Sequence, residues 1–318
     1  MFLFSLLARS WHWCMLLSLF IGGCSQPPDG EVYLFSYFKG NGEDGLYLAY
    51  SPDGYHWEEL GENQSFLIPQ AGQDKLMRDP CIIRGKDGKF HMVWTVSWNE
   101  KGIGYANSED LIHWSEQRYL PVMEHEPDAR NAWAPEVYYD EAKDQYLIFW
   151  SSTITGRYPE TQSEKENSYN HRMYYVTTSD FQDFSETALL YEPGFNVIDG
   201  TVVKEGDEYI MFVKDETIEP AEKNIRITRS TQLPDGFGPA GPPITGDYWA
   251  EGPTAIKIGE QWLLYFDKYM DKKMGAVASK DLIHWEDISD QVRFPSGMRH
   301  GTVFKVTDEE YQRLKSSL

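Results

Sequence analysis

The feature that most constrains the fold of this chain is a short sequence unit that recurs along it. Each copy has a Ser or Thr, an Asp two residues later, and an aromatic residue four positions after the Asp. Clear copies occupy residues 51–57, 108–114, 178–184 and 279–285, and a degenerate copy occupies residues 230–237. An Asp in such a turn can accept hydrogen bonds from free backbone amides, and the aromatic side chain can cover a core. A unit that recurs every 50 to 70 residues or so predicts a repeat architecture.

Each copy also has a fixed place in a longer pattern of strands. A strand of alternating character precedes each copy, at residues 46–50, 103–106, 173–177, 225–228 and 275–278. Upstream of most copies lies a second strand, at residues 89–95, 145–151, 209–214 and 261–266. An inner strand comes before each of these, at residues 79–84, 133–139, 199–204 and 251–257. Counting the outer strand after the turn, each unit has four strands, which is typical of a propeller blade.

The two ends of the pattern complement each other. Residues 32–57 contain a second strand and the turn motif but no inner strand, whereas residues 300–305 form an inner strand with no further strand after it. Joining these pieces completes a fifth blade and removes the exposed edges of the ring. A β-sandwich is the alternative, but it does not explain why the missing pieces match. We therefore predict an all-β fold, a five-bladed β-propeller over residues 31–306.

The segment before the propeller has the character of an export signal. Residues 1–23 are apolar, with Arg9 as their single charge, and they end in Ile21-Gly22-Gly23 before Cys24. This resembles the lipobox of bacterial lipoproteins, so we expect removal of residues 1–23 and lipidation of Cys24. The alternative is an ordinary secretory signal followed by a chance cysteine.

The remaining segments then have simple assignments. Residues 24–30 would be a tether and residues 307–318 a polar tail. The expected location is the cell envelope, facing the periplasm or on the cell surface, with membrane contact only through the lipid anchor. No later segment has the roughly 20 apolar residues that a membrane span needs.

Charge and cysteine content narrow the range of partners. The formal net charge of −21 argues against nucleic acid and anionic membrane surfaces as partners, because both would be repelled. A neutral ligand such as a sugar is compatible with this charge, and we expect a monomer. Cys81 would be the only thiol of the processed chain besides the lipidated Cys24, so there is no disulfide framework, and Cys81 reads as a small core residue.

Polar and aromatic residues stand at the starts of the inner strands, where a propeller brings its blades together. These residues are Asp79, Trp133, Asp199, Glu251 and His300. Three of the five are carboxylates, whose mutual repulsion would cost free energy if they served stability alone. The pattern therefore predicts a shared pocket in which carboxylates perform chemistry.

The motifs around these residues resemble those of glycoside hydrolase family 43. They are Arg78-Asp79-Pro80, the stretch from Asn131 to Glu136, Val197-Ile198-Asp199-Gly200, Glu251-Gly252-Pro253 and Arg299-His300-Gly301, in this order. The resemblance runs over roughly residues 31 to 306. That family contains arabinofuranosidases, xylosidases, arabinanases and some galactosidases.

The resemblance implies a role for each carboxylate. Asp79 would be the general base that activates water, Glu251 the general acid that protonates the leaving oxygen, and Asp199 the residue that orients the acid and raises its pKa. An inverting hydrolysis needs two carboxyl groups roughly 6.5 to 9.5 Å apart, one ionised and the other protonated. A third carboxylate beside Glu251 would keep that acid protonated through like-charge repulsion.

Other residues receive smaller roles. His300 resembles a family histidine that reaches the central channel, where it supports either the site or a structural calcium ion, although the sequence shows no run of oxygen ligands for calcium. The chemistry itself requires no cofactor. Trp98 and Trp133 are candidates for stacking on a sugar, with wall packing as the alternative. Glu136 lies past the rim and is not predicted to be catalytic.

The predicted function is an inverting, exo-acting glycosidase that releases L-arabinofuranose from plant polysaccharide side chains. Xylose or galactose would fit the same acids, and the insertion at residues 153–171 is expected to decide between exo and endo action. A family 32 fructosidase is disfavoured because the chain shows no Asn-Asp-Pro-Asn block near its start and no sandwich after the propeller. A family 130 phosphorylase is disfavoured because no Arg and His cluster suited to phosphate is evident. A surface glycan-binding lipoprotein with a dead site would have lost an acid, and none is lost.

Overall fold

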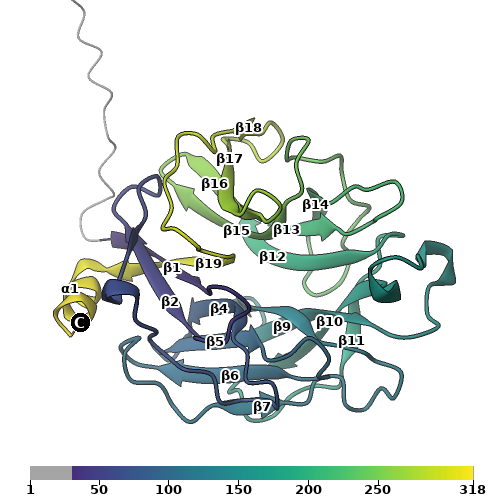
Figure 1. Cartoon of the computed structure of the whole chain (residues 1–318), viewed down its shortest axis with the longest axis horizontal. Coiled ribbons are helices and arrows are strands. Elements are labelled where there is room, and N and C mark those ends of the chain that lie inside the picture. Colours follow the sequence, from purple (N-terminus) through teal and green to yellow (C-terminus); the bar gives the residue numbers. More distant parts are fainter. Residues whose placement is uncertain (1–30, 318) are drawn as a thin grey trace, which may run out of the picture.

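The structure is a computed structural model that describes residues 31–317, and these residues form five antiparallel sheets around a common centre (Figure 1). The signal segment 1–23, Cys24 and the tether 24–30 lie outside the described residues, so the export and anchoring hypotheses stay predictions. The five sheets confirm the five-bladed β-propeller. Within the described residues, no helix is long and apolar enough to span a membrane.

Four blades have four strands each. They are β19 (Gly301–Thr307), β1 (Glu31–Tyr37), β2 (Tyr47–Ser51) and β3 (Glu58–Glu59); β4 (Arg78–Arg84), β5 (Phe90–Thr95), β6 (Ile103–Ser108) and β7 (Arg118–Leu120); β8 (Trp133–Asp140), β9 (Gln145–Thr153), β10 (His171–Thr178) and β11 (Ala188–Tyr191); and β15 (Glu251–Ile258), β16 (Gln261–Lys268), β17 (Lys273–Ser279) and β18 (Glu286–Asp287). Short 3-10 turns occupy Gly61–Asn63, Pro159–Thr161 and Glu166–Ser168.

The remaining blade has three strands, β12 (Val197–Glu205), β13 (Glu208–Asp215) and β14 (Asn224–Ser230). It is the blade whose repeat copy, at residues 230–237, is degenerate. The loss of the motif spacing and the loss of the outer strand therefore occur together, as expected if the turn motif directs the chain into that strand.

The ends of the propeller close the ring as predicted. Strand β19 pairs antiparallel with β1 over seven residues, from Glu31 opposite Thr307 to Tyr37 opposite Gly301. Strand β1 continues the blade by pairing with β2. The innermost strand of this blade therefore comes from the C-terminal part of the chain and the other three from the N-terminal part.

The repeated Asp caps the turn of each clear copy, as its position predicts. In the first copy, Asp53 Oδ1 accepts from the backbone amides of Tyr55 and His56 at 2.8 and 2.9 Å, and the Gly54 amide donates to Ser51 Oγ at 2.8 Å. Trp57 is buried and donates through Nε1 to the Gly54 carbonyl at 3.1 Å. The motif thus satisfies the backbone of the turn and places an aromatic residue in the core.

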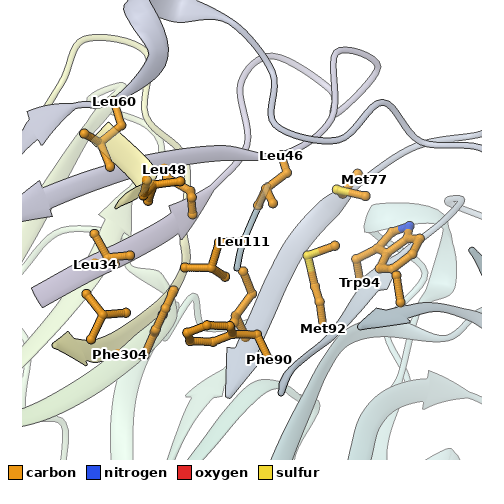
Figure 2. Close-up of a cluster of buried hydrophobic side chains, with 14 of the residues drawn as sticks. Leu34, Leu46, Leu48, Leu60, Met77, Phe90, Met92, Trp94, Leu111 and Phe304 are labelled. Carbon is orange, nitrogen blue, oxygen red and sulfur yellow. The ribbon is translucent and has the colours of Figure 1, made fainter. Parts of the chain in front are cut away.

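Apolar side chains fill the space between neighbouring blades. Figure 2 shows one such cluster, in which Leu34 and Leu48 from the closing blade face Phe90, Met92 and the aromatic ring of Trp94 from the next. Because each blade shares its apolar faces with both neighbours, the inner strands are held at fixed positions around the centre.

The prediction of a polar tail at residues 307–318 needs correction. Residues Asp308–Ser316 form helix α1, whose Tyr311 and Leu314 are buried in the same apolar cluster as Leu34 and Phe90. The helix begins with a capping box, because Thr307 accepts from the Glu310 amide while Glu310 accepts from the Thr307 amide. This Thr-x-x-Glu spacing is a recognisable start signal in the sequence.

Candidate active site

The inner strands share a local irregularity at the end that faces the pocket. In four of them the pairing with the second strand shifts register near the start: after Arg78 in β4, after Trp133 in β8, after Ile198 in β12 and after Glu251 in β15. The residue that follows has φ between 46° and 57° in every case, namely Asp79, Ala134, Asp199 and Gly252. Such bulges bend a strand and re-aim its side chains. Asp is among the residues that tolerate the left-handed region, and Gly occupies it freely.

The predicted site residues come together in one pocket. A cavity of about 830 Å³ is lined by Asp79, Trp98, Trp133, Asp199, Glu251 and His300 among others. The five strand-start residues are not equivalent, however. Asp79 and Asp199 occupy the bulge position itself, whereas Trp133 and Glu251 come one residue earlier, and His300 directly precedes β19.

Asp79 is held as an ionised carboxylate. Its Oδ1 contacts His300 Nε2 at 2.7 Å, and its Oδ2 accepts from Thr95 Oγ1 at 2.6 Å. Burial alone would raise the pKa of Asp79, but the hydrogen bond and charge of His300, together with Arg78 and Thr95, lower it well below its usual value. This is the charge state that a general base requires.

His300 lies at the centre of the carboxylates. Its Nδ1 is 3.3 Å from Asp267 Oδ2 and 3.7 Å from Glu251 Oε1, and its ring stands edge-on to Phe38. Burial would lower the pKa of His300, but hydrogen bonds to Asp267 and Asp79 and the charge of Glu251 raise it to about 10. The side chain is therefore an imidazolium that bridges opposite sides of the site.

Glu251 contacts a cation with each oxygen. Oε1 accepts from Arg299 Nη2 at 2.7 Å, and Oε2 accepts from Lys214 Nζ at 3.1 Å. Burial would raise the pKa of Glu251, but Lys214, His300 and Arg299 lower it to about 2. This differs from the sequence-based expectation of a raised pKa, which considered the neighbouring carboxylate and not the neighbouring cations.

Asp199 instead carries the raised pKa. Its Oδ2 accepts from the Gly252 amide at 2.9 Å, and its side chain is buried. Burial raises the pKa of Asp199 to about 7, with Glu251 and Asp79 adding to the shift and His300 and Lys214 opposing it. Because the charge of Glu251 contributes to this shift, the two carboxyl groups titrate as a pair, and the proton that the pair shares is lost as pH rises through about 7.

Asp79 and Glu251 contact opposite nitrogens of the His300 ring. The contacts are 2.7 Å for Asp79 Oδ1 and 3.7 Å for Glu251 Oε1, so the imidazole ring separates the two carboxyl groups. The arrangement therefore provides an ionised carboxylate, a proton-bearing carboxyl pair and a fixed cation between them.

Sequence reasoning missed two charged residues of this site, Lys214 and Asp267, and it gave no role to Arg78 and Arg299, which it named only as parts of motifs. Lys214 and Asp267 lie opposite Ile198 and Glu251 in the sheet register, at the pocket end of the second strand of their blades. A signal for these two residues was present in the sequence, because polar residues recur near the end of second strands that are otherwise apolar.

The two tryptophans form one side of the pocket. Trp98 is 41% exposed, donates through Nε1 to Asn41 Oδ1 at 2.9 Å, and lies over the Arg78 guanidinium at 4.2 Å. Trp133 meets Trp98 edge to face at 5.3 Å and donates to the Trp98 carbonyl. Tyr169 packs against Trp133 at 4.6 Å. These contacts fix both rings at the pocket wall, and only Trp98 presents a large exposed surface.

Glu136 lies below the pocket, beside a small cavity of about 20 Å³ in the channel. Its carboxyl group is contacted by Thr201 and Thr302 hydroxyls, each at 3.3 Å, and by Cys81 Sγ at 3.4 Å. Burial raises the pKa of Glu136 to about 8, so it is neutral at pH 7. It does not line the main pocket, in keeping with its exclusion from the predicted catalytic set.

The residues near His300 do not fit a calcium ion. Potential donor atoms of Glu251, Asp267 and His300 lie close together. Arg299 binds both carboxylates, however, and both nitrogens of His300 face carboxylate oxygens. Calcium requires six to eight oxygen ligands, whereas this cluster already neutralises its acids with cations. No step of the chemistry below uses a metal.

Comparison with known proteins places the whole propeller in one family. Residues 29–312 match the model of a family described as "Probable glycosyl hydrolase domain" and designated as related to glycoside hydrolase family 43. A curated relative, an alpha-L-arabinofuranosidase from Bifidobacterium longum, is 27% identical over 246 residues. This match covers 65% of the chain but only 23% of the relative, so the chain spans about a quarter of that protein's length.

Solved structures share the fold at low identity. The alpha-L-arabinofuranosidase from Lactobacillus brevis superposes with a TM-score of 0.53 at 18% identity, over 67% of this chain and 72% of that one. An exo-beta-1,3-galactanase from Phanerochaete chrysosporium gives a TM-score of 0.53 at 13% identity, over 70% of this chain and 51% of that one. At these identities the likeness concerns the fold.

Proposed function

Since the chain belongs to the glycosyl hydrolase family related to glycoside hydrolase family 43, we propose that this glycoside hydrolase acts with inversion on terminal L-arabinofuranosyl residues of plant polysaccharide side chains. The observation that carries the proposal is the placement of Asp79 and Glu251 on opposite sides of the His300 imidazolium, inside one pocket. Carbohydrate is the substrate class of this family.

In the proposed reaction, Asp79 accepts a proton from a water molecule as the water oxygen bonds to the anomeric carbon. The bond from that carbon to the leaving oxygen breaks, and the leaving oxygen receives the proton that the Asp199–Glu251 pair holds. We assign delivery of this proton to Glu251, because the Asp199 carboxyl is buried more deeply and its Oδ2 already accepts a hydrogen bond from the Gly252 amide. The low pKa of Asp79 and the pKa of about 7 at Asp199 supply the two charge states that the reaction needs.

Positive charge supports the same chemistry. An oxocarbenium-like transition state leaves developing negative charge on the departing oxygen, and Arg299 and Lys214 lie beside Glu251 where that oxygen would approach. The exposed face of Trp98 offers an apolar surface for a sugar ring.

The choice of arabinose draws support from the curated relative, which is an alpha-L-arabinofuranosidase. The exo-galactanase among the structural neighbours has the same fold. The alternatives are therefore a xylosidase, a galactosidase, or a glycan-binding propeller without turnover.

The test is release of sugar from a panel of 4-nitrophenyl glycosides carrying α-L-arabinofuranose, β-D-xylose and β-D-galactose, followed by arabinan, arabinoxylan and galactan. We expect turnover of the arabinofuranoside and release of monomeric arabinose. Cleavage of another glycoside in its place would show that arabinose is the wrong sugar. Binding without cleavage of any glycoside would show that the protein is a glycan-binding propeller and not an enzyme. Proton NMR of the first-formed anomer tests inversion, because a retained anomer would mean that a carboxylate attacks the sugar directly.

A further inference from the structure

Two fully buried lysines lie near the candidate acid: Lys214 contacts Glu251 and supports the reaction described above, whereas Lys223 has no role in that reaction. The side chains of Lys214 and Lys223 are each 1% exposed. A buried ammonium group is costly unless carboxylates surround it. Both lysines share one partner, Glu216, which contacts Lys214 through Oε2 and Lys223 through Oε1, both at 2.6 Å.

These contacts extend into a continuous chain of alternating charge. At one end, Lys214 Nζ lies 3.1 Å from Glu251 Oε2. At the other end, Lys223 Nζ lies 2.6 Å from Glu166 Oε2. We call Lys214, Glu216, Lys223 and Glu166 the charged chain. It leads from the candidate acid to Glu166, whose side chain is 41% exposed.

Glu166 belongs to the β9–β10 loop, residues 154–170, which corresponds to the insertion noted in the sequence. Glu166, Asn167 and Tyr169 of this loop line the pocket. Glu166, Asn167 and Ser168 have φ of 49° to 56°, a conformation that costs free energy for residues other than Gly. The Lys223 contact and hydrogen bonds from Arg130 to the carbonyls of Asn167 and Ser168 hold this segment in place.

We propose that the charged chain is a positioning unit that couples the seating of the β9–β10 loop to the charge state of Glu251. The proposal rests on the proposed role of Glu251 as proton donor. When Glu166 pairs with Lys223, the attraction between Lys223 and Glu216 weakens. Glu216 then attracts Lys214 more strongly. Lys214 then shares its charge between Glu216 and Glu251. Loss of the Glu166 contact reverses each of these steps.

Other charged and titratable groups also face Glu251, and none of them joins it to the loop. Arg299 binds Oε1 and is itself held by Asp267. His300 lies on the same side, with Asp79 beyond it. Asp199 and the Tyr269 phenol interact with Lys214 as well as with Glu251. The charged chain is therefore the route by which a change at Glu166 reaches the acid.

The alternation of charge predicts a signed response. In Glu166→Gln, Lys223 turns to Glu216 and releases Lys214 toward Glu251, which favours the ionised acid. In Lys223→Met, Glu216 draws Lys214 away from Glu251, which favours the protonated acid. The two variants should therefore move the proton affinity of the Asp199–Glu251 pair in opposite directions.

The matched control is Glu219→Gln. Glu219 pairs with Lys165 of the same loop at 2.6 Å, but both side chains are more than half exposed, and this ion pair does not lead to Glu251. Glu219→Gln therefore shows how the pH profile responds when the loop loses an ion pair and the contacts of the charged chain stay intact.

The experiment measures the pH dependence of kcat/KM on 4-nitrophenyl α-L-arabinofuranoside for the wild type and the three variants. We expect the basic limb to move to lower pH in Glu166→Gln and to higher pH in Lys223→Met, by on the order of half a pH unit each. Glu219→Gln should leave the limb in place. Shifts in the same direction, no shift, or an equal shift in Glu219→Gln would overturn the proposal. Should Lys223→Met fail to fold, the sign of the Glu166→Gln shift against the control still decides it.

A second readout separates this proposal from the assignment of the acid. Carbon-13 NMR of carboxyl-labelled Asp and Glu, assigned by signals lost in Asp199→Asn and Glu251→Gln, follows the titration of the pair near pH 7 without any substrate. If Glu251→Gln retains wild-type turnover, the role of Glu251 fails while the titration still tests the charged chain. If Glu251→Gln is inactive and the titration of the pair is the same in Glu166→Gln and Lys223→Met as in the wild type, only the proposed role of the charged chain is wrong.

Discussion

At the scale of residues, the site is a set of carboxylates whose protons are distributed by cations. His300 keeps Asp79 ionised from one side and contacts Asp267 and Glu251 from the other. Lys214, His300 and Arg299 lower the pKa of Glu251, whereas burial raises the pKa of Asp199. Neighbouring carboxyl groups thus differ in charge because burial dominates at Asp199 and cations dominate at the others, which is how one pocket can hold both an ionised and a proton-bearing carboxyl group.

Replacing either Asp79 or Glu251 by its amide should abolish most turnover. We expect Asp79→Asn and Glu251→Gln each to lower kcat on an aryl arabinofuranoside by roughly 10²- to 10⁴-fold, because each change removes one proton-transfer group. Circular dichroism and the thermal midpoint should remain close to those of the wild type. A variant that folds and keeps its rate would rule out the role of that residue.

Asp199 should control the basic side of the pH–rate profile. Activity should fall as pH rises through the pKa of the pair, near 7, because the proton for the leaving oxygen is then lost. Asp199→Asn removes the repulsion that holds this proton, while Lys214 and Arg299 still favour ionised Glu251. The basic limb of kcat/KM should therefore move to lower pH. A profile with unchanged shape would contradict this role.

Sequence reasoning identified the three carboxylates and the ionised state of Asp79, but it placed the raised pKa on Glu251 instead of Asp199. Asp79, Asp199 and Glu251 stand in motifs that can be read directly, and the pocket does bring them together. The cations could not be ranked in the same way. Lys214 lies 37 positions from Glu251 and Arg299 lies 48 positions from it, and their contacts depend on the register of three strands. A pKa depends on distances, and those come only from the fold.

At the scale of elements, the repeated bulge is what presents the carboxylates. The register shift follows Arg78, Trp133, Ile198 and Glu251 in their strands, and the next residue takes a left-handed conformation each time. Alternation of apolar residues predicts a strand but does not reveal where its pairing slips by one residue. For this reason the strand boundaries were predicted well. The sequence did not reveal that Asp79 and Asp199 occupy the bulge position whereas Glu251 comes one residue before it.

Gly252 is the bulge residue for which a side chain is least tolerable. A Cβ there would lie 2.1 Å from His300 Cγ, and the residue has φ of 57°. We expect Gly252→Ala to lower the free energy of unfolding by about 2 kcal/mol or more, through strain together with displacement of His300. Chemical denaturation measures this change.

Gly259 provides the matched control in the same blade. Its φ is 59°, and no atom lies within 4 Å of the Cβ position. Gly259→Ala therefore carries the conformational cost without the contact. Equal losses in the two variants would show that the contact with His300 contributes nothing to stability.

At the scale of the whole molecule, the ring and its closing blade follow from the sequence with few errors. Five units, complementary end pieces and a degenerate fourth blade were all readable from the repeat, because each unit repeats the same local requirements of turn and strand. Helix α1 was missed because its segment is mostly polar, although it contributes Tyr311 and Leu314 to the core.

The helix should be part of the cooperative fold. Leu314 is 1% exposed, so Leu314→Ala should lower the free energy of unfolding by about 2–5 kcal/mol through lost burial and a residual cavity. Leu189 in β11 is 44% exposed and serves as the control, with an expected change within about 0.5 kcal/mol. Denaturant titration of both variants compares them directly. A small effect at Leu314 would mean that α1 is dispensable for stability.

The pairing of β1 with β19 also has a consequence for the order of events during synthesis. The seven paired positions lie about 270 residues apart along the chain, and contacts of such separation form late because of the entropy of closing the loop. Arg299 and His300, which immediately precede β19, leave the ribosome after every other member of the carboxylate cluster. Until they arrive, Asp79 and Glu251 have no imidazolium between them. The nascent chain therefore acquires its chemistry only when its ring is closed.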